Sequence, residues 1–231
     1  VVGTIHNYKL EVGPATEGDT CLFNVSSGES VRFGVLLHNA AVAKGGALAA
    51  ASRPADATTA PAQRTAPPVE LFGVAGRADC VVFVVDRSQS MLEVFDYVRA
   101  ELMESVGELT GEQRFHVIFF AGPKPKENPH RRLIPATDVN KETPRRFILD
   151  VLPSGLTDPR PALRRALTVL RVGGPDSAKT VFLLTDGVFE DTDAVLSDAR
   201  RLTADGDVRI HTLLVNRQRP PLAVRTLRTI A

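Results

Sequence analysis

The chain has 231 residues, enough for one large α/β domain and a smaller attachment. Hydrophobic residues make up 43% of it and charged residues 24%, a globular composition that excludes a largely disordered chain. The formal net charge of +1 excludes a strong overall field that would attract nucleic acid or an anionic membrane. No apolar run approaches the roughly 18 residues needed to cross a bilayer, so no transmembrane segment is expected.

Residues 1–39 predict a short β-rich segment. Apolar and polar residues alternate in NYKLEV, TCLFNV and SVRFGVLL, and glycines separate these stretches. Two or three short strands are expected here, and the sequence leaves their fold open.

Residues 40–68 form a different kind of segment, rich in Ala, Pro and Thr with almost no large apolar side chain. Such a segment buries too little surface to offset its ordering entropy, so a flexible linker is expected. An alanine-rich helix over 47–52 is the alternative. A linker of this kind holds a domain at a distance, which favours an extracytoplasmic setting without fixing the location.

From residue 69 to residue 231 the pattern alternates between strands and helices. Uninterrupted apolar runs predict strands buried on both faces, over 80–85, 115–120, 180–184 and 209–215. Amphipathic stretches predict helices over 91–109, 143–152, 159–170, 192–202 and 221–230. Residues 131–137 fit a short edge strand, where proline is tolerated. This order predicts a three-layer, doubly wound α/β domain with a mostly parallel, Rossmann-like sheet.

Oxygen-bearing side chains gather where the predicted strands end, and open α/β sheets bind ligands at that edge. Asp86, Ser88 and Ser90 follow the first buried strand at every second position. Asp186 follows the third buried strand, and Thr157 lies in a glycine-containing loop just before a helix. Three separate segments are therefore expected to converge on one site.

This donor set predicts a divalent cation. Carboxylate and hydroxyl oxygens suit Mg²⁺, Mn²⁺ or Ca²⁺ rather than Zn²⁺ or copper. Two carboxylates only neutralise such a cation and hydroxyls add little electron density, so the ion would stay electrophilic and short of ligands. A carboxylate from outside would fill the open position. The expected partner is a protein that presents Asp or Glu.

The stretches VVFVVDRSQSM, SGLTDP and LLTDG resemble the von Willebrand factor type A (VWA) domain and its metal-ion-dependent adhesion site. The resemblance is closest to bacterial members, whose first strand reads FVVDRSxSM, and it covers residues 69–231. It implies that Ser88 and Ser90 are direct metal ligands and that Thr157 is a direct or switchable one. Asp86 and Asp186 would act directly or through water. The family is generally not enzymatic and captures a partner's Glu or Asp through the metal.

The sequence departs from the family pattern at three places. Gln89 stands where glycine is frequent, and so does Leu156, immediately before Thr157. The chain stops at Ala231, inside or just after the last predicted helix. The closing strand of such domains is then missing, so a domain truncated at its C-terminus is expected, with one sheet edge exposed.

Other interpretations remain open for the same residues. Ser90 could cap a helix that begins at Met91. A Mg²⁺-dependent phosphatase or hydrolase could use Asp86 as its nucleophile, although Ser88 stands where such enzymes carry a second Asp as general acid. A metal-free scaffold of the same fold is the third possibility. His116 and His211 lie in predicted strands and are interpreted as core or surface histidines.

Overall fold

The computed structural model describes residues 66–174, 176–187, 189, 191–203, 208–216 and 221–230, together with the backbone of three strands in the first 65 residues. The strands are β1 (Lys9–Val12), β2 (Leu22–Ser26), β3 (Arg32–His38), β4 (Pro68–Leu71), β5 (Val74–Arg77), β6 (Cys80–Asp86), β7 (Arg114–Phe120), β8 (Lys126–Glu127), β9 (Ile134–Pro135), β10 (Lys179–Thr185) and β11 (Val208–Asn216). The helices are η1 (Gln89–Met91), a 3₁₀ turn, and α1 (Phe95–Glu108), α2 (Asp138–Asp150), α3 (Arg160–Leu170), α4 (Thr192–Thr203) and α5 (Pro221–Ile230). None of the helices in this described part is long and apolar enough to cross a membrane.

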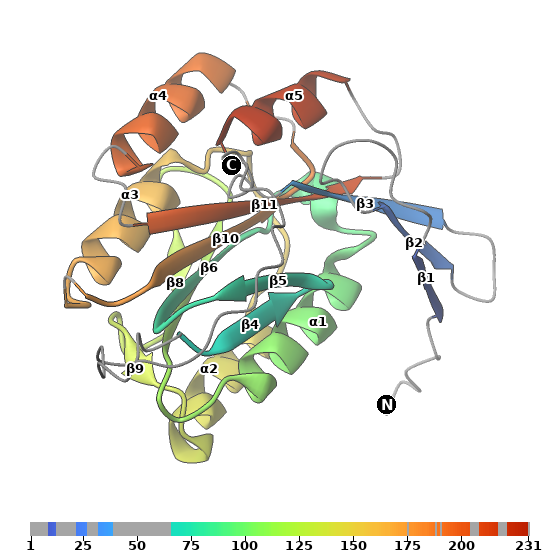
Figure 1. Cartoon of the computed structure of the whole chain (residues 1–231). Coiled ribbons are helices and arrows are strands. Elements are labelled where there is room, and N and C mark those ends of the chain that lie inside the picture. The colour runs from blue at the N-terminus through green and yellow to red at the C-terminus, as the bar shows by residue number, and fades with distance from the viewer. Residues whose placement is uncertain are drawn as a thin grey trace, which may run out of the picture.

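The central sheet has the predicted parallel core. Its strand order is β1-β2-β3-β11-β10-β6-β7-β8, and the four strands β11, β10, β6 and β7 run parallel (Figure 1). The predicted edge strand at 131–137 is confirmed as β9, which pairs antiparallel with β7. Because β6 lies inside the parallel core, its carboxyl end opens between the ends of two neighbouring strands.

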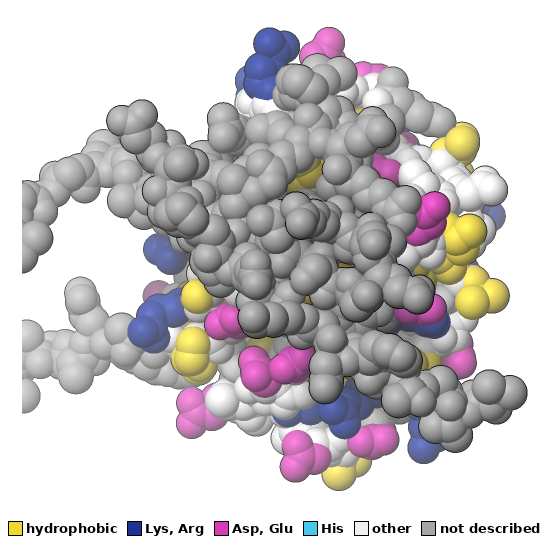
Figure 2. All heavy atoms as spheres, turned by 90° about the vertical axis from the view of Figure 1, so that its right-hand side faces the viewer, with side chains coloured by type: hydrophobic (Ala, Val, Ile, Leu, Met, Phe, Trp, Pro, Cys, Tyr) yellow, Lys and Arg dark blue, Asp and Glu magenta, His cyan; other side chains and the backbone are white. Residues whose placement is uncertain are grey.

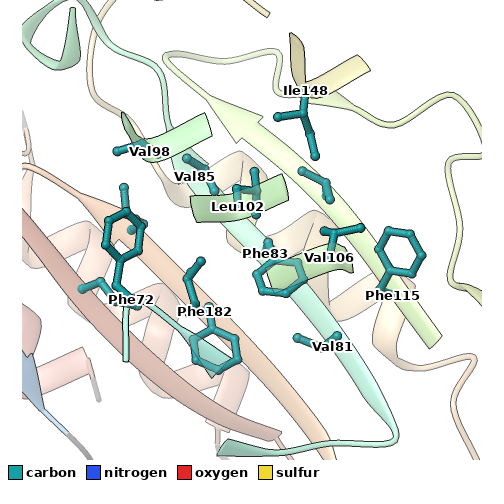
Figure 3. Packing of buried hydrophobic residues seen from close by; sticks show 14 of the residues in the cluster. Phe72, Val81, Phe83, Val85, Val98, Leu102, Val106, Phe115, Ile148 and Phe182 are labelled. Carbon is teal, nitrogen blue, oxygen red and sulfur yellow. The ribbon is translucent and has the colours of Figure 1, made fainter. Parts of the chain in front are cut away.

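Each face of the sheet is covered by its own set of helices, which gives the three predicted layers (Figure 1). Alternate residues of β6 point to opposite faces: Val81, Phe83 and Val85 pack towards α1 and α2, whereas Val82 and Val84 pack towards α3, α4 and α5. Figure 3 shows the first of these clusters, in which Phe83 and Phe182 of the sheet lie near Leu102 and Val106 of α1. The strands are therefore buried on both faces, as their apolar sequences predict.

A β-hairpin that the sequence did not predict covers part of the α1 face. Strands β4 and β5 pair antiparallel around Phe72 and Gly73, whose φ angles are 52° and 74°. The Phe72 ring packs edge-on against Tyr97 of α1, with ring centroids 5.3 Å apart. Gly76 lies against His211: a Cβ atom on this glycine would stand 3.1 Å from the imidazole Nε2. The hairpin thus fills the part of the face that the helices leave open.

Two helices begin at different residues from those predicted. The segment after β6 first forms the 3₁₀ turn η1, and α1 starts at Phe95 rather than at residue 91. Helix α2 starts at Asp138, five residues before the predicted start at 143. The Thr137 side chain caps this helix by accepting a hydrogen bond from the backbone N–H of Asn140, and Pro144 is buried inside it.

The first strands of the chain belong to the same sheet. Strand β3 pairs antiparallel with β11, with Leu37 opposite Leu213, and β2 and β1 extend the sheet further (Figure 1). Strand β3 therefore covers the edge that β11 would otherwise present, whereas the sequence predicted only that one unspecified edge of the sheet would be exposed. Most of the predicted linker at 40–68 lies outside the described residues, which resume at residue 66.

Candidate metal centre

Asp86 ends β6 and is completely buried. Its Oδ1 accepts a hydrogen bond from the backbone N–H of Ser88 at 2.7 Å, and its Oδ2 accepts one from the Thr185 hydroxyl at 2.6 Å. Thr185 is the last residue of the neighbouring strand β10, and its Oγ1 also accepts a hydrogen bond from the backbone N–H of Gly187 at 3.1 Å. The ends of two parallel strands are thus joined through one carboxylate.

The environment of Asp86 disfavours its negative charge. Burial raises the pKa of this carboxyl from its ordinary 3.8 to about 6, although the hydrogen bonds from Thr185 and Ser88 act in the opposite direction. The negative charge of Asp186 raises the pKa further. Two carboxylates therefore interact at the ends of adjacent strands, and the donors that stabilise Asp86 are neutral hydroxyl and amide groups. A cation at this edge would relieve both effects.

The two serines of the predicted site lie side by side. Their Oγ atoms are 3.0 Å apart, with Ser88 buried and Ser90 exposed. Ser88 precedes η1 but makes no side-chain cap hydrogen bond, and Val94 is the residue that precedes α1. Ser90 therefore does not cap α1, and the capping interpretation of this residue is wrong.

The loop that carries Thr157 is fixed to the loop that carries the serines. The backbone N–H of Gln89 donates to the Gly155 carbonyl at 3.2 Å, and the backbone N–H of Ser154 donates to the Arg87 carbonyl at 2.7 Å. The Arg87 guanidinium also donates from Nη1 to the carbonyls of Leu152 and Ser154, each at 3.3 Å. These contacts bring the two loops together. The Thr157 side chain is half-buried, and its coordination of a metal stays a prediction.

Gly155 allows the loop to approach the sheet closely. Its φ is +89°, and a Cβ atom here would lie 2.9 Å from the carbonyl oxygen of Ala121, just after β7. Any larger residue would push the Thr157 loop away from the strand ends. The close contact with Ala121 therefore explains why a glycine stands two residues before Thr157, the predicted ligand.

Asp186 follows β10 directly and is buried, next to the end of β6. The chain turns at Gly187, whose φ is +79° and where a Cβ atom would collide with Ala223 at 2.6 Å. This tight turn packs the strand end against α5. The position of Asp186 fits the predicted site, and its role as a metal ligand stays a prediction.

Sequence reasoning missed Arg87 and Thr185, which hold the site together. Thr185 immediately precedes Asp186, so a hydroxyl at the last strand position was a usable signal. Arg87 belongs to the family stretch FVVDRSxSM, but the sequence indicated no role for it. Its contact with Leu152 spans 65 residues and could not be read from local pattern.

The donors match a hard cation better than a soft one. Within the part of the chain that is described, no group of three or more His, Cys, Asp and Glu side chains is arranged as a metal site. A cation at the end of β6 would therefore depend on the hydroxyls as well as the two carboxylates. Hydroxyl and carboxylate oxygens fit Mg²⁺, Mn²⁺ or Ca²⁺ and lack the nitrogen and sulfur ligands that zinc prefers.

The two strand histidines are core residues, as interpreted. His211 is buried and its ring stacks on Phe182, with centroids 5.0 Å apart. His116 is also buried, and its Nε2 lies 2.9 Å from a carboxylate oxygen of Glu127 on β8. Glu127 in addition accepts hydrogen bonds from Arg165 at 2.8 Å and Arg131 at 3.0 Å. We refer to His116, Glu127, Arg131 and Arg165 as the Glu127 cluster.

The comparisons with known proteins agree with this architecture. A family model described as the von Willebrand factor type A domain matches residues 81–188. The manganese-loaded TRAP protein of Plasmodium vivax is 21% identical over 66% of this chain and 61% of its own, with a TM-score of 0.55. A von Willebrand factor type A protein from Catenulispora acidiphila is 20% identical over 59% of this chain and 33% of its own, with a TM-score of 0.52.

A third similar structure is the pilus adhesin SpaC from Lactobacillus rhamnosus GG in its open conformation. It is 14% identical over 96% of this chain and 30% of its own, with a TM-score of 0.56. The chain thus spans less than two thirds of each of the three solved chains, and at these identities the likeness concerns the fold. None of the curated proteins matches. The family match therefore identifies residues 81–188 as a von Willebrand factor type A domain, and the similar structures share its fold.

Proposed function

We propose that this domain binds a divalent cation, Mg²⁺, Mn²⁺ or Ca²⁺, and uses it to capture an acidic side chain of a protein partner. Asp86, Ser88, Ser90, Thr157 and Asp186 would hold the ion. When bound, the cation would offer an electrophilic position to a carboxylate from outside. The domain would then act as an adhesion-type interaction module rather than as an enzyme.

The observation that carries this proposal is the interaction of Asp86 with Asp186 at the ends of two adjacent strands. Burial makes the charge of Asp86 costly, and the nearby charge of Asp186 adds to that cost. The neighbouring Ser88 and Ser90 hydroxyls add neutral oxygen donors. A site of this kind neutralises a divalent cation without saturating it, which leaves room for a further carboxylate.

Two of the similar structures give independent support. One is described as manganese-loaded and another as a pilus adhesin, and both share this fold. These descriptions apply to those proteins. For the present chain they make metal binding and adhesion the first functions to test.

The alternative role of Asp86 as a nucleophile receives less support. Both carboxylate oxygens accept hydrogen bonds, and the side chain is completely buried. A nucleophile has to present an oxygen to its substrate. The neighbouring Ser88 and Ser90 carry neutral hydroxyls, which suit a hard cation better than they suit general acid catalysis.

Thermal unfolding with added metal tests the proposal. After treatment with EDTA, addition of Mn²⁺ or Mg²⁺ at 100 times its dissociation constant is expected to stabilise the domain by about 2.7 kcal/mol. For a domain of this size the shift in Tm is about 5 to 10 °C. The variant Ser88→Ala/Ser90→Ala should lose the shift. Ser177→Ala/Ser197→Ala, which removes two hydroxyls elsewhere, should retain it. Equal shifts in both double variants would sink the proposal.

A further inference from the structure

Large apolar side chains are concentrated around the candidate metal centre. Among the described residues, those that stand largely in solvent are Leu92, Val139, Leu149, Leu152, Leu156 and Val172. Leu92, Leu152 and Leu156 belong to the two loops that meet at the end of β6, and they are 64%, 66% and 64% exposed. We call these three residues the leucine rim. Single exposed leucines are ordinary, but three around one site are not.

The two loops hold the leucine rim in place. Leu92 lies two residues after Ser90, and its backbone N–H donates to the Gln89 carbonyl at 3.2 Å. Leu156 immediately precedes Thr157, and Leu152 is fixed through its carbonyl to the Arg87 guanidinium. The hydrogen bond from Gln89 to Gly155 then joins the two sides. The rim therefore borders the metal centre from both loops rather than from one.

The surroundings of the rim are mostly uncharged. The segment 152–157 reads Leu-Pro-Ser-Gly-Leu-Thr and carries no charged side chain, although most of it is exposed. On the other loop, Gln89 and Ser90 are exposed and neutral. The exposed acids that adjoin the rim in sequence are Glu93, next to Leu92, and Asp150, two residues before Leu152. Figure 2 views the molecule from the side to the right of Figure 1, where the visible hydrophobic side chains are scattered among Asp, Glu, Lys and Arg side chains. Exposed acids beside both parts of the rim disfavour a partner segment with several acids.

We propose that the leucine rim contacts large apolar side chains that flank the captured acid in the partner. The partner is then a protein segment with one Asp or Glu, bordered within two residues by Leu, Ile, Phe or similar residues. This inference rests on the proposed function, because the acid is what places the segment over the rim. Burial of apolar surface beside the metal centre would add affinity and would exclude water from the ion–carboxylate contact.

A random peptide library displayed on phage tests both levels of the proposal. The library is bound to the immobilised chain in Mn²⁺ and eluted with EDTA. Enrichment of Asp or Glu in the EDTA eluate is expected from the proposed function. Enrichment of large apolar residues within two positions of that acid is expected from the leucine rim. Acidic peptides without apolar neighbours would overturn the rim and leave metal-dependent capture standing. No EDTA-dependent enrichment would overturn both.

Matched variants then assign the preference to the rim. The probes are two synthetic peptides with one Glu, flanked either by leucines or by glycines. Leu92→Ser/Leu156→Ser is expected to weaken binding of the leucine-flanked peptide about tenfold, which corresponds to about 1.4 kcal/mol. Its Mn²⁺ affinity and its binding of the glycine-flanked peptide should not change. Val139→Ser/Val172→Ser, which alters two apolar side chains that are even more exposed but lie elsewhere, should bind both peptides as the wild type does. Equal losses in both double variants, or none in either, would refute the assignment.

Discussion

Asp86 on β6 and Glu127 on β8 are both carboxylates within the sheet layer, yet their surroundings shift their pKa values in opposite directions. Glu127 has a side-chain exposure of 9% and contacts His116, Arg131 and Arg165. Burial opposes its ionisation, but the hydrogen bonds and charges of Arg165 and His116 prevail and lower its pKa. Asp86 receives its hydrogen bonds from neutral groups, and burial raises its pKa to about 6.

This difference separates a structural acid from a candidate binding acid. Glu127 is neutralised by side chains of the chain itself, and it ties β8 to β7 and α3. Asp86 lies at the strand ends beside a second acid, where its charge is costly in the absence of a cation. The proposed cation would offset this cost. Three substitutions test this difference.

The largest effect is expected for Glu127→Gln. The amide keeps the shape but leaves the Arg165 guanidinium without its ionic partner, so the free energy of unfolding should fall by about 3 kcal/mol at pH 7. Because the pKa of Glu127 is lowered, its contribution is complete above its ordinary value of 4.5 and is lost as the pH falls through the folded value. Urea unfolding at pH 7 and pH 4 should show a smaller difference between variant and wild type at pH 4.

The control for this substitution is Asp96→Asn. Asp96 pairs with Arg99 on the surface of α1, and its side chain is 90% exposed. An exposed pair of this kind contributes under ~1 kcal/mol, so the control should unfold almost as the wild type does. If Asp96→Asn lowered the free energy of unfolding as much as Glu127→Gln does, burial would not explain the contribution of the Glu127–Arg165 pair.

The opposite sign is expected for Asp86→Asn. In EDTA at pH 7 this variant should be more stable than the wild type by about 1 to 2 kcal/mol. The substitution removes a carboxylate whose raised pKa destabilises the folded state by about 3 kcal/mol at pH 7. Part of this gain is lost because the asparagine amide is a poorer hydrogen-bond acceptor for the Thr185 hydroxyl. The same variant should lose the stabilisation by Mn²⁺. Urea unfolding with and without metal measures both effects. Clear destabilisation in EDTA would mean that Asp86 is a structural acid like Glu127.

A smaller effect is expected for Arg87→Ala, which frees the Thr157 loop from the serine loop. Mn²⁺ affinity, measured by calorimetry, should fall about tenfold because Arg87 orients the loop without serving as a ligand. In a Thr157→Ala background, Arg87→Ala should lower the Mn²⁺ affinity only slightly further, since Arg87 acts through Thr157. Arg146→Ala, an exposed arginine on α2, serves as the control. Additive losses in the double variant would contradict this coupling.

Much of the core was predictable because its signals are local. Runs such as VVFVV and VFLL are apolar without interruption, and they mark strands that helices cover on both sides. Asp86, Ser88 and Ser90 could be grouped because they share one short loop. Asp186 could be added because parallel strands end at the same edge of a sheet.

The remaining features depend on contacts that sequence pattern does not report. The hairpin β4–β5 turns at Phe72-Gly73 with two positive φ angles, a turn for which Asn-Gly or Asp-Gly is the usual signal. The early start of α2 was missed because Pro144 suggests a helix boundary, whereas Thr137 caps the helix ahead of it. The pairing of β3 with β11 joins residues about 180 positions apart, and nothing in either strand specifies the other.

The hairpin β4–β5 also determines how the domain would bear mechanical tension. A pull on the chain at residue 66 first loads two hydrogen bonds, each 3.0 Å long. Arg77 donates one to the Ala66 carbonyl, and the backbone N–H of Ala78 donates the other to the Pro67 carbonyl. The pair Pro68–Arg77 comes next, so β4 would peel from β5 one residue pair at a time. Strand β6 would carry the load only after the hairpin had opened. A pull from this side would therefore open the hairpin before it disturbed the hydrogen bonds between the loops at the far end of β6.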